Sequence, residues 1–76
     1  MPTETKPEIL LQFGHRVRKL REARSLSQEQ LGFESDLDRT YISGIERGKR
    51  NVALCNIQKI AKALDVSISQ LFEKIE

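Results

Sequence analysis

The side chains best suited to chemistry in this sequence lie close together between residues 39 and 43. Arg39, Thr40 and Ser43 share one face of a predicted helix. An arginine can donate two hydrogen bonds to the O6 and N7 atoms of guanine, and a threonine offers a hydroxyl and a methyl group to the bases. This combination suits a surface that reads the edges of DNA bases. Taken alone, these residues are more simply explained as solvent-facing polar side chains, but the signature that surrounds them, described below, leads us to assign base readout to all three.

Polar and basic residues beside this face predict contacts to the sugar-phosphate backbone of a duplex. Lys49, Arg50 and Asn51 directly follow the predicted helix. Arg47 lies at its end, on the polar face. Such side chains fix the position of a protein on DNA, and each charged contact makes binding more sensitive to salt. Tyr41 has two interpretations, because its hydroxyl can reach a phosphate or its ring can serve packing alone.

Two short helices joined by a tight turn are predicted to position this face, within the segment SQEQLGFESDLDRTYISGIERG. Ser27 can cap the first helix, with Gln30 completing a capping box. Asp38 can cap the second helix, and Gly48 can end it in a left-handed conformation. These features predict a helix-turn-helix. The apolar positions expected to face one shared core are Leu31, Leu37, Ile42 and Ile45.

Three further helices are predicted around this pair, which makes the chain an all-α, compact five-helix domain. Ser67 and Gln70 form a second capping box, whereas Ala53 offers no capping side chain to the fourth helix. Residues 1–6 are polar and are expected to form a disordered tail, with residues 7–76 as a single domain. The helices are expected at about 7–24, 28–35, 39–47 and 54–64, with a fifth that carries Ile68, Leu71, Phe72 and Ile75. The fourth is expected to bury Leu54, Ile57, Ile60, Ala61 and Leu64.

The composition agrees with a small DNA-binding domain. The chain has 76 residues, of which 38% are hydrophobic and 32% charged, with a net charge of +2. Positive charge is concentrated in residues 15–24 and 38–50, and the segment between them is acidic. A helix-turn-helix can present both basic segments to one duplex, so we expect double-stranded DNA as the partner.

The residue types needed for catalysis or metal binding occur singly. His15 has no second ligand at helical spacing and is expected at the surface, and Cys55 is expected to be a partly buried small hydrophobe. The sequence contains no nucleophile motif and no glycine-rich phosphate loop. We therefore predict no enzyme activity, no metal, no cofactor and no small-molecule ligand. With no signal peptide or membrane-spanning stretch, we expect a cytoplasmic protein.

The helix-turn-helix segment resembles the phage repressor and Cro-like (XRE) family of transcription regulators. Between residues 37 and 47, the chain is most similar to the controller proteins of restriction-modification systems. It departs from the family pattern at Gly32, where alanine is common, and at Asp36, where glycine is frequent. The matching residues are Ser27–Leu31, Leu37–Asp38, Tyr41–Ser43 and Ile45–Gly48.

The resemblance implies a sequence-specific regulator that acts as a homodimer on a near-palindromic operator, with its two recognition helices about 34 Å apart. It implies a DNA backbone contact from Gln28, which could also brace the first residues of the recognition helix. It further implies a mostly buried, structural ion pair between Arg21 and Glu46. The residues that we assign to the dimer interface are Val66, Ile68 and Ile75, whereas Leu71 and Phe72 are expected to complete the monomer core.

Two alternatives remain open at this point. One is a repressor of a phage, plasmid or toxin-antitoxin locus with the same fold. The other is a protein-protein interaction module that does not bind DNA. RNA polymerase is a candidate partner for Glu29 and Glu34 on the second helix, although an ordinary solvated surface is the simpler explanation of these residues.

Overall fold

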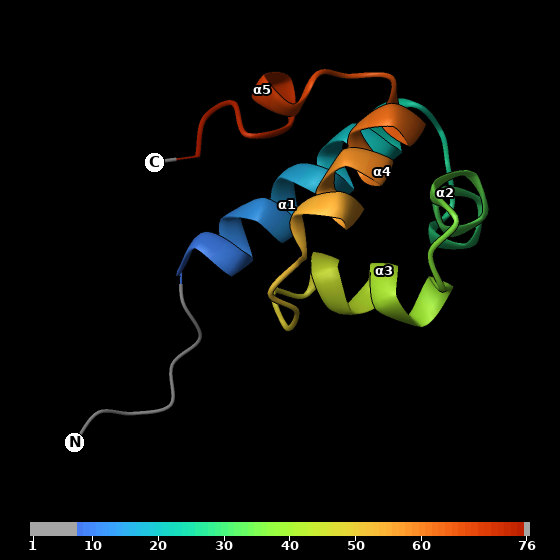
Figure 1. Ribbon diagram of the computed structural model, residues 1–76, viewed down its shortest axis with the longest axis horizontal. Coiled ribbons are helices and arrows are strands. Elements are labelled where there is room, and N and C mark those ends of the chain that lie inside the picture. Colours follow the sequence, from blue (N-terminus) through green and yellow to red (C-terminus); the bar gives the residue numbers. More distant parts are fainter. Residues whose placement is uncertain (1–7, 76) are drawn as a thin grey trace.

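A computed structural model, which describes residues 8–75, contains five helices that surround one core (Figure 1). The helices confirm the predicted all-α fold and four of the five predicted positions to within one residue at each end. The expected tail at residues 1–6 lies outside the described residues. The helices are α1 (Glu8–Ala23), α2 (Gln28–Ser35), α3 (Arg39–Glu46), α4 (Leu54–Leu64) and α5 (Ile68–Leu71).

The helix starts follow from local side-chain hydrogen bonds. The Ser27 Oγ accepts a hydrogen bond from the backbone N–H of Gln30 at 3.0 Å, and the Gln30 side chain accepts one from the backbone of Ser27 at 2.7 Å. The Asp38 carboxylate caps α3 by accepting from the Thr40 N–H at 2.8 Å. Both capping predictions are confirmed, as is the absence of a side-chain cap at Ala53.

The fifth helix is shorter than predicted. It begins with the expected Ser67 and Gln70 capping box but ends at Leu71, so Phe72 and Ile75 lie beyond it. Beyond this single helical turn, short-range backbone hydrogen bonds hold the chain in turns, and Lys74 takes a positive φ of 71°. The chain therefore leaves the helix and brings the Phe72 ring against that of Phe13 in α1, with 5.1 Å between centroids.

The turn between α2 and α3 needs a left-handed residue and a small one. Asp36 supplies the first, with a φ of 59°. At Gly32, an added Cβ would lie only 2.7 Å from the Leu37 carbonyl oxygen. The two helices of the motif therefore approach each other closely at this point, and glycine keeps the room that this approach requires.

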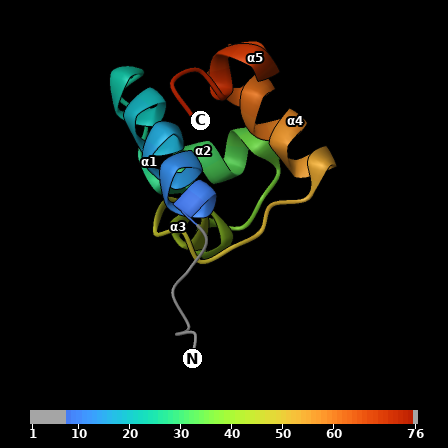
Figure 2. The ribbon, with the colours of Figure 1, turned by 90° about the vertical axis from the view of Figure 1, so that its left-hand side faces the viewer.

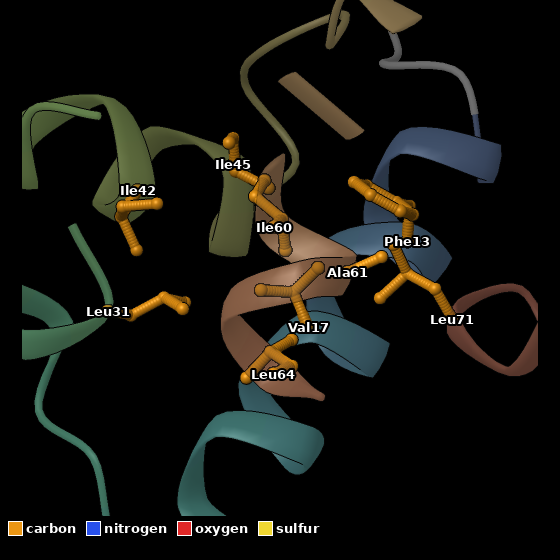
Figure 3. Packing of buried hydrophobic residues seen from close by; sticks show 9 residues of the cluster. All are labelled: Phe13, Val17, Leu31, Ile42, Ile45, Ile60, Ala61, Leu64 and Leu71. Atoms are coloured by element: carbon orange, nitrogen blue, oxygen red, sulfur yellow. The ribbon is translucent and has the colours of Figure 1, made fainter. Parts of the chain in front are cut away.

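Side chains from all five helices meet in the core (Figure 3). Leu31 in α2 and Ile42 in α3 are fully buried, together with Ile60 and Leu64 in α4. Leu71 is also fully buried, as predicted, whereas Phe72 is half-buried. Figures 1 and 2 both place α3 at one edge of the molecule and α5 at the opposite edge. The remaining core residues are Phe13, Val17, Ile45 and Ala61.

Gly14 lies where α1 crosses the end of α3. A Cβ at this position would collide with the carbonyl oxygen of Ile45 and would lie 2.9 Å from that of Glu46. The sequence indicates only a loss of helix propensity at Gly14, but the structure shows that its missing side chain permits the crossing. Within residues 8–75, the helices are too short or too polar to cross a lipid bilayer.

We predict that Gly14→Ala destabilises the domain by about 1–3 kcal/mol, because the backbone of α3 must shift to admit the methyl group. Urea denaturation followed by far-ultraviolet circular dichroism measures the change. Gly44→Ala is the matched control, since its Cβ would meet only the flexible side chain of Arg50. Equal stability of the two variants would contradict the assignment of a close approach at Gly14.

Candidate nucleic-acid interface

The outer face of α3 carries the residues assigned to base readout. Arg39 and Thr40 are exposed in its first turn, and Ser43 is half-buried one turn later. Ile42 and Ile45 lie on the opposite face and are buried in the core. Because the apolar face fixes the rotation of the helix, the polar face is held outward at the edge of the molecule seen in Figure 1.

The chain turns back along α3 immediately after the helix. Gly48 adopts a φ of 73°, and the Lys49 N–H donates to the Gly44 carbonyl at 2.8 Å. This turn leaves the side chains of Lys49, Arg50 and Asn51 exposed beside α3. Arg47 is also exposed, although its Nε lies 3.4 Å from the Ser43 carbonyl. The structure therefore brings together four of the residues assigned to the DNA backbone, whereas Gln28 lies apart from them at the start of α2.

Tyr41 is held between α3, α4 and the loop that follows α3. Its hydroxyl accepts a hydrogen bond from the Asn56 side chain in α4 at 3.2 Å. The guanidinium carbon of Arg50 lies 5.5 Å from the centroid of its ring, within the range of a cation–π interaction. Tyr41 thus has a packing role in the structure, and the phosphate contact stays a prediction.

Asn56 is a residue of this region that the sequence did not single out. It precedes Ile60 by one helical turn and so lies at the edge of the buried face of α4. This position at the edge of the buried face was the only sequence signal that could have drawn attention to Asn56. The sequence contains no indication that this edge of α4 faces Tyr41, because the contact depends on how α3 and α4 pack.

An ion pair joins α1 to the end of α3. The Arg21 Nε lies 2.7 Å from Glu46 Oε2, and a second nitrogen lies 3.1 Å from Oε1. Arg21 also donates to the carbonyl of Leu26 at 2.7 Å, so one guanidinium connects three segments of the chain. The two charged side chains are 11% and 3% exposed, and the pair is therefore largely removed from water.

Gln28 completes this network from the start of α2. Its side-chain amide donates to Glu46 Oε1 at 3.0 Å. It therefore braces the last residue of α3, not the first residues as the sequence suggested. A primary amide carries two hydrogens, so one remains for the predicted contact to a phosphate.

The hydrogen bonds that Arg21 donates to the Glu46 carboxylate raise the pKa of Arg21 above its ordinary value, although burial opposes this shift. A raised pKa in the folded state means that the stabilisation by Arg21 is complete below the ordinary arginine pKa. It is lost only as the pH rises past the raised pKa. The guanidinium is therefore charged at every pH at which the domain would be studied.

Two expectations about isolated residues have different outcomes. His15 is exposed, as predicted, but Cys55 is exposed as well, and its predicted partial burial is wrong. Cys55 is the second residue of α4, before that helix reaches the core. Across residues 8–75, no group of three or more metal-ligating side chains is present.

Apolar residues at the starts of α4 and α5 remain exposed. Leu54 is 74% exposed, so its predicted burial is wrong: as the first residue of α4, it lies one turn before the helix meets the core. Ile68 is 41% exposed at the start of α5. Val66 and Ile75 are half-buried and pack against the core, so of the three predicted interface residues Ile68 offers the most free surface.

Comparison with known proteins gives consistent matches over most of the chain. A helix-turn-helix family model matches residues 17–71. Control protein C.BamHI of Bacillus amyloliquefaciens is 58% identical over 86% of this chain and 82% of its own length. The crystal structure of the restriction-modification controller protein C.AhdI from Aeromonas hydrophila has a TM-score of 0.85 and is 55% identical, covering 87% of this chain and all of that chain.

A solved complex is also similar to this chain. It contains the controller protein C.Esp1396I as a tetramer with its natural 35 base-pair operator. The protein in that complex is 40% identical, with a TM-score of 0.83 and coverage of 90% of each chain.

We predict that Glu46→Ala destabilises the domain by about 3–5 kcal/mol, because it leaves the largely buried guanidinium of Arg21 without its carboxylate. Arg18→Ala is the matched control, since it breaks the exposed pair with Glu22 and should change stability by at most about 0.5 kcal/mol. Chemical denaturation measures both variants. Similar effects of the two substitutions would show that the Arg21–Glu46 pair is no more important than a surface pair.

Proposed function

The chain belongs to the helix-turn-helix family and, within it, to the restriction-modification controller proteins; on that premise we propose how its residues bind an operator. It is a DNA-binding transcription regulator and not an enzyme. We propose that two copies bind a near-palindromic site, with α3 of each copy in the major groove. The observation that carries this proposal is the outward face of α3, where Arg39, Thr40 and Ser43 lie opposite the buried Ile42 and Ile45.

Residues on both sides of α3 would fix the domain on the duplex. The free amide hydrogen of Gln28 and the first N–H groups of α2 suit one phosphate. Lys49, Arg50 and Asn51 suit phosphates beyond the other end of α3, and Arg47 lies next to them. These contacts carry no sequence preference, so they supply affinity and orientation while the face of α3 supplies specificity.

The exposed apolar residues at the starts of α4 and α5 support a homodimer. Ile68 would form the centre of the interface, with Val66 and Ile75 at its side and Leu54 as a further apolar residue. Because α5 lies at the edge opposite α3, pairing there leaves both recognition helices accessible to DNA (Figure 2). The tetramer of C.Esp1396I on its operator supports a further step, in which two such dimers occupy neighbouring sites.

Regulation would follow from where the dimer binds. A dimer over a promoter excludes RNA polymerase, whereas a dimer upstream can contact it. Glu29 and Glu34 are exposed on α2 beside Phe33, which is 88% exposed, and we propose this patch as the polymerase contact.

The similarity to controller proteins favours regulation of a restriction-modification system over the role of a phage, plasmid or toxin-antitoxin repressor. The site of action is the cytoplasm, where the operator DNA lies.

We predict that Arg39→Ala weakens binding to the operator by about 1–3 kcal/mol and removes preference for one base pair, while leaving binding to unrelated DNA nearly unchanged. Lys49→Ala should instead weaken binding to all sequences. It should also reduce the slope of log affinity against log salt concentration by about one, which corresponds to one counterion. The operator is first selected from a random duplex pool. Fluorescence anisotropy over a range of salt concentrations then measures each affinity.

Lys62→Ala is the control for these variants, because Lys62 is exposed in the last turn of α4, away from α3. It should bind like the unsubstituted protein. A uniform loss of affinity in Arg39→Ala would assign Arg39 to the backbone. Failure of the folded protein to select any sequence would refute the proposed arrangement as a whole.

We predict that Ile68→Lys shifts the protein from dimer to monomer, because it places a charge in the proposed interface. Sedimentation equilibrium measures the change. Phe33→Lys makes a similar substitution at another exposed apolar residue and should leave the dimer intact. Dimers of equal stability in both variants would show that the start of α5 is not part of the interface.

A further inference from the structure

Three of the four glycines are explained by the backbone, and Gly44 is not. Gly14 and Gly32 lie against neighbouring backbone atoms, and Gly48 has a positive φ. Gly44, in the middle of α3, has neither reason. The three atoms that an added Cβ would approach most closely all belong to the side chain of Arg50: Cγ and Nε at 3.1 Å and Cδ at 3.7 Å.

We infer that Gly44 is a positioning residue, whose missing side chain forms a slot that holds Arg50 in the orientation needed for DNA binding. The inference rests on the proposed function of Arg50 as a DNA contact. It adds that the contact is prepared by α3 before DNA is bound, so that Arg50 is not a freely moving residue of a basic loop.

The ring of Tyr41 supports the guanidinium end of the Arg50 side chain. The aliphatic part of Arg50 lies along Gly44, and its guanidinium carbon lies 5.5 Å from the ring centroid. The ring is in turn held by the hydrogen bond from Asn56 to its hydroxyl. Arg50 is thus supported at two points along its length, by the backbone of α3 and by a fixed aromatic face.

The charge of Arg50 remains available in this arrangement. Within residues 8–75, the ion pairs involve Arg16, Arg18, Arg21 and Arg24, and none involves Arg50. An arginine that is ordered but unpaired loses less conformational entropy when it meets a phosphate than one that is disordered beforehand. Gly44 weakens the intrinsic helix propensity of α3, and the slot for Arg50 is the compensating gain.

A double-mutant cycle on operator affinity tests the inference. Gly44→Ala should fold normally yet bind the selected operator about three- to tenfold more weakly, because its methyl group displaces Arg50. In an Arg50→Ala background, the same change should alter affinity by less than about twofold. In a Lys49→Ala background, which keeps Arg50, the full effect of Gly44→Ala should return.

Three results of the cycle would overturn the inference. The first is an unchanged affinity in Gly44→Ala. The second is an equal loss with and without Arg50, which would mean that the added methyl group meets DNA directly. The third is an unchanged affinity in Arg50→Ala itself, because the proposed DNA contact of Arg50 then fails and the inference fails with it.

A measurement without DNA separates the slot from the proposed function. Tyr41 is the only tyrosine, so its ring protons are readily assigned by nuclear magnetic resonance. Nuclear Overhauser contacts between this ring and the Arg50 side chain should be present in the unsubstituted protein, lost in Gly44→Ala and retained in Lys49→Ala. Their absence from the unsubstituted protein would overturn the inference whatever the DNA result.

Discussion

The Arg21–Glu46 ion pair is the interaction on which the position of α3 most depends. Glu46 ends the recognition helix, and its carboxylate accepts hydrogen bonds from Arg21 in α1 and Gln28 in α2. The same end of α3 lies against Gly14, where the two backbones nearly touch. Electrostatics and steric contact therefore fix one end of α3, while the Asp38 cap fixes the other. A helix of eight residues needs such support, because its own hydrogen bonds are too few to stabilise it alone.

The sequence predicted well what depends on neighbouring residues. The caps at Ser27, Asp38 and Ser67 and the left-handed conformation of Gly48 act over a few positions, so residue type and spacing are sufficient evidence for them. The inward face of α3 was equally readable, because Ile42 and Ile45 repeat at helical spacing. The resemblance to repressors supplied the pairing of Arg21 with Glu46, which lie 25 residues apart and share no local signal.

What the sequence missed depends on how the helices pack. Leu54 has the spacing of a core residue, yet α4 begins one turn before it reaches the core, so this leucine is exposed. Cys55 is exposed for the same reason. Phe72 and Ile75 have the pattern of a longer fifth helix, but the chain turns instead toward α1, where Phe72 finds an aromatic partner. The role of Gly14 is likewise defined by atoms that are distant in sequence, the carbonyl oxygens of Ile45 and Glu46, and Arg50 lies against Gly44 only because the chain turns back after α3.

The division of α3 into a buried and an exposed face has a consequence for how such regulators diverge. Ile42 and Ile45 support folding, while Arg39 and Thr40 have few contacts within the domain. Substitutions at exposed positions usually change folding free energy by no more than about 0.5 kcal/mol. Under the proposed base readout by Arg39 and Thr40, new operator preferences are therefore accessible by one or two substitutions without compensating changes in the core. With so few substitutions, two controller systems that enter the same cell could stop binding each other's operators.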